Sequence, residues 1–207
     1  FELAAAGDRR PVRIPTLGRL AVHNALAGAA AGLAAGLRPD AIVAALATGW
    51  SAPHRGELVR AGGVTIVDDS YNASPGSVAA ALELLAGMPG RRIAVLGAMR
   101  ELGDGHDDGH RRSGAAAAAV VDRLVVVGDE AGAMVAGART AGLAPDSIVL
   151  VADRDAARDL LLAELRPGDV VLVKASRGVE LDILVDELRV GLVGVAADGA
   201  DRAQAAR

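Results

Sequence analysis

Four short apolar runs constrain the fold of this chain more than any other feature of its sequence. They span residues 93–96, 124–127, 148–151 and 170–173, and no polar side chain interrupts any of them. Strands with one solvated face alternate apolar and polar residues, whereas strands covered on both faces are apolar throughout. The runs therefore predict the buried strands of a parallel sheet.

Helical segments are predicted between these strands. The clearest are residues 75–87 and 178–188, and in the second Leu181, Leu184 and Leu188 fall on one face. When strands and helices alternate in this way, the sheet is mostly parallel and carries helices on both sides. The predicted fold class is therefore α/β, of the Rossmann-like kind.

The first 50 residues have a different pattern. Apolar residues recur at helical spacing through residues 18–48, with Gly36 as a stop and Pro39 in the first turn of a second helix. No buried strand pattern accompanies them. We therefore expect residues 1–50 to be the helical end of one domain.

A second, complete domain is expected to follow. Apolar segments on either side of Gly62-Gly63 predict a β-hairpin at its start. With the strands and helices described above, residues 51–193 make a whole Rossmann-like unit. Residues 194–207 are rich in Ala, Asp, Arg and Gly, so we expect a flexible tail.

Composition excludes several classes of protein. Aromatic residues are limited to Phe1, Trp50 and Tyr71 and the net charge is -4, which argues against a nucleic-acid partner. The chain has no cysteine, so disulfides and thiolate metal sites are excluded. No apolar run approaches the roughly 20 residues of a membrane span. No signal peptide is visible, so we expect a cytoplasmic protein, and a start at Phe1 indicates a piece of a longer one.

The polar segment 68–75 lies between a predicted strand and a predicted helix. Ser74 and Pro75 suit the cap and first turn of that helix. Residues 69–72 then fall at the carboxyl end of a parallel strand, where α/β sheets bind ligands. Asp69 there could accept hydrogen bonds from a ribose. The same residue types also form ordinary turns, so a plain strand-to-helix turn is the alternative.

Two basic sites lie near the beginning and near the end of the predicted domain. His54 and Arg55 lie at its junction with the first part, where an arginine can bind a phosphate through two parallel hydrogen bonds. Lys174, Ser176 and Arg177 follow the last predicted strand, and two cations with a hydroxyl suit an anionic ligand. For His54 and Arg55 the alternative is a solvated charge on a connector, and for Lys174 to Arg177 it is a basic turn without a ligand.

The segment 97–110 contains a possible metal-binding pair. His106 and His110 are four residues apart, a spacing that places both on one face of a helix. Gly105 and Gly109 instead predict a loop, so no metal site is expected here.

Three motifs for phosphate binding and nucleophilic catalysis are missing. The chain contains no G-x-x-x-x-G-K-[ST] loop, no G-x-S-x-G elbow, and no G-x-G-x-x-G after a strand. It therefore lacks the loop that cradles the β- and γ-phosphates of ATP, and a dinucleotide-binding interpretation is weakened.

Four motifs, taken in order, resemble the Mur ligases of peptidoglycan synthesis. They are N-A-L-A at 24–27, D-D-S-Y-N-A-S-P-G-S at 68–77, I-A-V-L-G-A-M-R-E-L-G at 93–103 and V-K-A-S-R at 173–177. His110 also falls where that family has a histidine. The motifs extend over most of the chain, and their combination is specific where each alone is not.

The resemblance implies an ATP-dependent amide ligase that adds D-alanyl-D-alanine to UDP-N-acetylmuramoyl-tripeptide through an acyl phosphate. It implies that residues 51–193 are the C-terminal Mur ligase domain and that residues 1–50 end the central ATPase domain. The phosphate-binding loop and most Mg²⁺ ligands would then lie in the rest of the same polypeptide. The fragment alone is expected to be inactive.

The resemblance also implies a nucleotide-binding set in this chain. Asn24 would contact adenine, and Asp69 would hold the ribose. His54 and Arg55 would touch the nucleotide near adenine and phosphate.

A second set is implied for the substrate. Lys174 and Arg177 would be the catalytic groups, facing the substrate or the developing acyl phosphate together with Ser176. Tyr71 and Asn72 would lie in the same cleft as substrate-binding residues.

The chain departs from the family pattern at three places. Ala21 stands where a second adenine-side asparagine is usual, Ala98 replaces an acidic residue, and Gly56 replaces a larger apolar residue. These departures motivate an alternative, a Mur-like amide ligase that acts on a different amine or peptide substrate. A further alternative is a non-enzymatic α/β nucleotide-binding module, which the missing phosphate-binding loop would explain.

Overall fold

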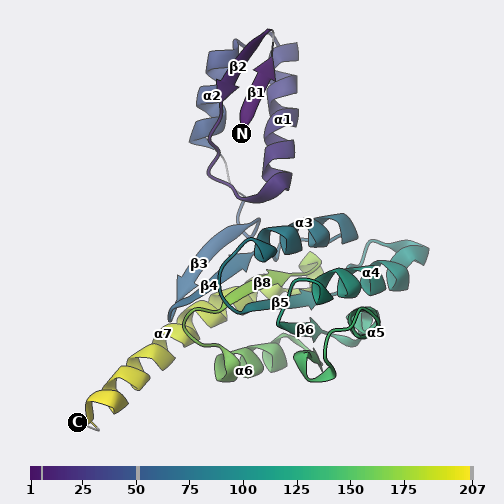
Figure 1. The fold of residues 1–207 in the computed structure, drawn as a ribbon, viewed down its shortest axis with the longest axis vertical. Coiled ribbons are helices and arrows are strands. Elements are labelled where there is room, and N and C mark those ends of the chain that lie inside the picture. The colour runs from purple at the N-terminus through teal and green to yellow at the C-terminus, as the bar shows by residue number, and fades with distance from the viewer. Residues whose placement is uncertain (6, 50–51, 206–207) are drawn as a thin grey trace.

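A six-stranded sheet forms the centre of the larger part of the molecule (Figure 1). The computed structural model describes residues 1–5, 7–49 and 52–205, with side chains up to residue 194. The strand order is β3-β4-β8-β5-β6-β7, and only β3 is antiparallel to its neighbour. The strands are β3 (Glu57–Ala61), β4 (Val64–Asp68), β5 (Arg92–Gly97), β6 (Arg123–Val127), β7 (Ile148–Val151) and β8 (Val170–Lys174). The predicted strands, the hairpin and the mostly parallel sheet are confirmed.

Helices cover both faces of this sheet (Figure 1). One face carries α3 (Pro75–Ala86), α4 (His106–Ala118) and α5 (Ala133–Thr140), and the other carries α6 (Arg154–Glu164) and α7 (Leu181–Ala205). Along β5, Ala94 and Leu96 pack against the first group while Ile93 and Val95 pack against the second. Because neighbouring residues are buried on opposite sides, the strand is apolar throughout.

The N-terminal part is a separate small unit. It contains β1 (Glu2–Ala5), β2 (Asp8–Pro11), α1 (Gly18–Ala34) and α2 (Pro39–Thr48). The two helices are confirmed, whereas the antiparallel β1–β2 hairpin was not predicted from the sequence. Leu3, Val12, Ala29 and Ile42 form its core. The hairpin turns at Gly7, whose φ of 80° favours glycine.

This unit meets the rest of the molecule through α1 and α3 (Figure 1). Arg19 at the start of α1 forms an ion pair with Glu83 of α3, with 3.1 Å between Nη1 and Oε1. The predicted boundary between residues 50 and 51 falls outside the described residues, as do residues 206–207 of the predicted tail. The division into domains therefore stays a prediction. Among the described residues, no helix is both long and apolar enough to cross a membrane.

Two helix starts differ from the sequence prediction. The segment expected to be a loop through residue 110 becomes helical at His106, and Gly109 lies inside α4. A Cβ on Gly109 would lie 2.6 Å from Leu102 Cδ1, so the glycine permits close packing rather than breaking the helix. At the other site the helix expected from residue 178 begins at Leu181, after a 3₁₀ turn at Arg177–Val179.

Helices α4 and α5 pack closely because each presents a glycine to the other's backbone. A Cβ on Gly114 would lie 2.6 Å from the carbonyl carbon of Met134, and one on Gly137 would lie 2.8 Å from that of Arg111. Neither backbone segment can move aside as a flexible side chain could. The two helices therefore require glycine at both positions.

Gly114→Ala should destabilise the protein. Overpacking costs about 1–3 kcal/mol or more, which exceeds the gain of about 1 kcal/mol in helix propensity from replacing glycine with alanine. Urea denaturation followed by circular dichroism would measure the loss. Gly76→Ala in α3 is the matched control, because nothing lies within 4 Å of its added Cβ. Equal stability of Gly114→Ala and the wild type would contradict the packing argument.

Candidate functional site

Polar residues from two neighbouring parallel strands meet at one edge of the sheet. Asp68 at the end of β4 pairs with Val173 of β8, so the loops that follow these strands start side by side. The antiparallel strand β3 begins at the same edge, where Glu57 pairs with Asp68. The connector that carries His54 and Arg55 therefore arrives beside both loops.

The ammonium group of Lys174 links the two loops. Its Nζ lies 2.6 Å from Oδ2 of Asp69 and 2.8 Å from the carbonyl oxygen of Asn72. The Lys174 side chain is only 2% exposed. Burial lowers the pKa of Lys174 and raises the pKa of Asp69, and each shift is opposed by the partner's charge. Lys174 thus faces the loop that carries Asp69 rather than an open pocket.

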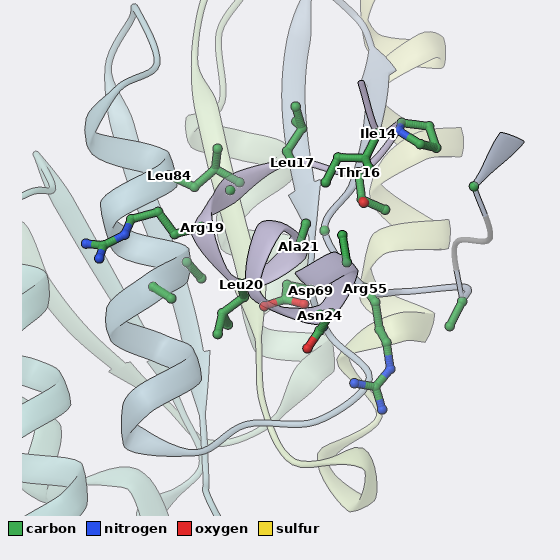
Figure 2. A pocket seen from close by; sticks show the side chains of 18 of the residues that line it. Ile14, Thr16, Leu17, Arg19, Leu20, Ala21, Asn24, Arg55, Asp69 and Leu84 are labelled. Carbon is green, nitrogen blue, oxygen red and sulfur yellow. The ribbon is translucent and has the colours of Figure 1, made fainter. Parts of the chain in front are cut away.

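A pocket of about 440 Å³ separates α1 from α3. Asn24 of α1, Arg55 of the connector and Asp69 after β4 all line it, as Figure 2 shows around the first turns of α1. Its other walls are largely apolar; they include Leu17, Leu20, Ala21 and Leu84. The volume and the few polar groups on apolar walls are typical of a small-molecule site.

A second pocket, of about 610 Å³, adjoins Arg55 and Tyr71. The guanidinium carbons of Arg55 and Arg177 lie 4.2 and 5.5 Å from the centroid of the Tyr71 ring. Both distances are within the range of cation–π attraction. His54, Asn24 and one carboxylate, that of Asp182, also line this pocket. The two arginines outnumber the carboxylate, so the walls suit an anionic group.

His54 lines the second pocket but not the first, and a hydrogen bond to a buried carboxylate fixes its ring. Nδ1 donates a hydrogen bond to Oδ2 of Asp68 at 2.8 Å. Asp68 is buried, and its other oxygen accepts hydrogen bonds from the backbone N–H and the hydroxyl of Ser70. The hydrogen bond that His54 donates to Asp68 raises the pKa of His54 above its usual 6.5.

Two of the predicted substrate-binding residues already have partners within the chain. The Ser176 hydroxyl is buried and accepts a hydrogen bond from the backbone N–H of Arg100 at 3.0 Å. The side-chain oxygen of Asn72 accepts from the backbone N–H of Ala73 at 2.9 Å. Both residues shape the loops at this edge, and neither lines the two pockets described above.

His106 and His110 share a helix, contrary to the predicted loop, but the geometry does not suit a metal ion. Nε2 of His110 accepts a hydrogen bond from the backbone N–H of Met99 at 2.9 Å, and Nδ1 donates to the carbonyl of His106 at 2.7 Å. Burial lowers the pKa of His110, which favours this neutral form. Both ring nitrogens of His110 are therefore occupied.

A third pocket, of about 480 Å³, was not predicted from the sequence. It lies beyond β5, β6 and β7 and is lined by Arg100, Glu130 and Arg154. Arg100 donates to Glu130 Oε2 at 3.1 Å and to the carbonyl of Gly178 at 2.9 Å. The sequence does carry a signal for this charged cluster, because charged residues begin two positions after the strands predicted at 124–127 and 148–151.

The ion pair between Lys174 and Asp69 should show strong coupling in a double-mutant cycle. Lys174→Met or Asp69→Asn alone leaves a desolvated charge without its partner, which typically costs about 3–5 kcal/mol. The double variant should lose less than the sum of the two, since neither charge remains.

The loss in free energy of unfolding caused by Asp69→Asn should also shrink as pH rises, because Lys174, whose pKa is lowered, then loses its proton. Urea denaturation across pH would measure both effects, and additive losses would contradict the pairing.

Comparisons with known proteins agree on one family. Residues 54–177 match the family model described as Mur ligase, glutamate ligase domain. The UDP-N-acetylmuramoyl-tripeptide--D-alanyl-D-alanine ligase of Mycobacterium leprae is 43% identical over 196 residues, which cover 86% of this chain and 38% of that protein. This chain thus spans about two fifths of the length of such curated relatives.

Solved structures give the same result. MurF from Acinetobacter baumannii superposes with a TM-score of 0.81 at 28% identity, covering 91% of this chain and 41% of that one. MurF from Thermotoga maritima, solved in complex with ADP, gives a TM-score of 0.77 at 29% identity and covers 92% and 43% of the two chains. The matched segment includes the loop after β4 and the first residues after β8, on which the site is built. The chain therefore belongs to the Mur ligase family.

Proposed function

We propose that this chain is the C-terminal part of an ATP-dependent ligase that joins D-alanyl-D-alanine to UDP-N-acetylmuramoyl-tripeptide. The observation that carries the proposal is the convergence of Asn24, Arg55 and Asp69 on one pocket between the two units. Relatives that share the fold are named for this reaction, and one was solved with ADP. The rest of the polypeptide would supply the phosphate-binding loop that this sequence lacks.

The pocket offers a separate partner for each part of a nucleotide. The Asn24 amide can donate to and accept from the polar edge of adenine, while the apolar walls can pack against the faces of the adenine ring. Asp69 can accept from the ribose hydroxyls through Oδ1, because Lys174 binds Oδ2. Arg55, at the border of the first and second pockets, can bind a phosphate through two parallel hydrogen bonds.

The second pocket would hold the reacting group. In the first step a substrate carboxylate oxygen attacks the terminal phosphorus of ATP, and ADP leaves as the acyl phosphate forms. The amine of the second substrate then attacks the acyl carbon, the C–O bond to phosphate breaks, and the amine loses a proton. Arg177 and Arg55 beside Tyr71 would stabilise the negative charge that develops on the phosphoryl oxygens. Lys174 would act by fixing Asp69.

The described residues contain no cluster of three His, Asp or Glu side chains that could hold a metal ion. The proposal places the Mg²⁺ ligands mainly outside this chain.

The third pocket is proposed to take the dipeptide. D-alanyl-D-alanine is small and carries one ammonium and one carboxylate group. Arg100 and Arg154 can bind the carboxylate, and Glu130 or Glu180 can face the ammonium. The hydrogen bond from Arg100 to the carbonyl of Gly178 ties this pocket to the loop that carries Arg177.

Arg55→Ala should weaken nucleotide binding by the full-length polypeptide. A hydrogen bond to a charged group contributes about 1.5–3 kcal/mol, which corresponds to a Kd for ADP about 10- to 100-fold higher. Isothermal titration calorimetry with ADP would measure the change. Arg60→Ala is the control, because Arg60 is exposed on β3 and lines none of the three pockets. ADP binding of wild-type strength by Arg55→Ala would contradict the proposed role.

Arg100→Ala should raise the KM for D-alanyl-D-alanine about 10-fold or more, because a charge-assisted contact to the carboxylate is lost. The KM for ATP should change little, since Arg100 lines only the third pocket. Both constants can be measured by phosphate release from the full-length polypeptide with ATP, Mg²⁺ and the UDP-linked tripeptide.

The same assay tests the proposed reaction itself. If the wild type forms no product with D-alanyl-D-alanine but does so with another amine, the substrate assignment is wrong and the alternative ligase is correct. Ala21 and Ala98 motivate that alternative. If it forms no amide with any amine, the ligase proposal fails.

A further inference from the structure

The connector before β3 contains an unusual backbone conformation. His54 has a φ of 61°, and among the described residues the only other non-glycine residue with positive φ is Glu180, at 58°. Left-handed backbone is unfavourable for a residue with a Cβ, so surrounding contacts must hold it. His54 directly precedes Arg55, which lines both the first and the second pocket.

Three contacts fasten this connector to the end of β4. The ring of His54 donates a hydrogen bond to Asp68 at 2.8 Å. The backbone carbonyl of His54 accepts one from the backbone N–H of Tyr71 at 3.1 Å. The Arg55 guanidinium then stacks over the Tyr71 ring at 4.2 Å. Two consecutive connector residues are thus bound to both ends of the short segment 68–71.

The anchor of these contacts is rigid. Asp68 is 1% exposed, and Ser70 binds the carboxylate oxygen that His54 does not use. Asp68 cannot turn toward another partner without leaving the Ser70 hydroxyl unpaired. By contrast Arg55 is exposed and has a long side chain, so its position depends on where the connector is held.

We propose that His54 is a positioning residue, whose ring on Asp68 and carbonyl on Tyr71 hold Arg55 over the Tyr71 ring and beside the nucleotide pocket. This inference rests on the proposed function, because it takes Arg55 to be a phosphate ligand. His54 itself need not touch the nucleotide.

The hydrogen bond between His54 and Asp68 makes this arrangement sensitive to pH. That bond raises the pKa of His54, and Asp182 and Asp186 of α7 add to the shift while burial opposes it. A raised folded-state pKa means that the contribution is complete below about 6.5 and is lost as pH rises through the raised value. The connector should therefore be held less firmly as pH rises through that raised pKa.

Two substitutions separate the ring's roles in the full-length polypeptide. His54→Gly accepts the positive φ but removes the ring, so the KM for ATP should rise about two- to tenfold with kcat less affected. His54→Asn tolerates positive φ, and its amide nitrogen occupies the position of Nδ1 without titrating. It should keep the wild-type KM at pH 6.5 and lose the rise in KM that the wild type shows as His54 is deprotonated at higher pH. His106→Asn, away from all three pockets, is the control and should leave the pH profile unchanged.

An NMR titration of the imidazole of His54 tests the same arrangement without catalysis. The pKa should lie above 6.5 in the wild type and fall in Asp68→Asn, and the Tyr71 ring signals should shift as His54 titrates. If the wild type makes no product, the ligase proposal fails, while the titration still decides whether His54 holds the connector. A His54 pKa at or below 6.5, or a wild-type KM and pH profile in His54→Gly, would overturn the inference.

Discussion

Burial of the central sheet on both faces is the constraint on which the rest of the structure depends. Helices α3, α4 and α5 cover one side and α6 and α7 the other, so nearly all residues of the four inner strands β4, β8, β5 and β6 are buried away from a ligand. Polar side chains that could bind a ligand are therefore concentrated at the carboxyl edge, where each parallel strand ends and a loop begins. The three pockets described above all lie along that edge or its border with α1.

Within that edge, the ion pair between Lys174 and Asp69 links the loops of two strands that are far apart in sequence. Desolvation opposes both charges, and a second acceptor, the carbonyl of Asn72, helps to keep the ammonium in place. Such a pair adds little net stability compared with apolar residues, but it allows few alternative geometries. Here the pair fixes the orientation in which Asp69 lines the first pocket.

The strands of the sheet could be predicted because burial on both faces makes consecutive residues apolar, as at 93–96. Gly109 was wrongly interpreted as a loop residue, since the close packing of Leu102 and Pro75 against it inside α4 is not visible in the local pattern. The motifs predicted which residues gather at the site, and Asn24, Arg55 and Asp69 do line one pocket. They did not predict the burial of Lys174, which depends on a contact between residues 105 positions apart.

The antiparallel direction of β3 has a consequence for how such a chain can vary in length. If β3 ran parallel to β4, the connector would enter at the opposite edge and could lengthen without disturbing the site. Instead it enters at Glu57, opposite Asp68, and Arg55 lies two residues before that point. An inserted or deleted residue between His54 and Glu57 would displace the guanidinium from Tyr71. Length variation in this part of the chain is thus restricted to positions upstream of His54, although the segment is an exposed surface connection.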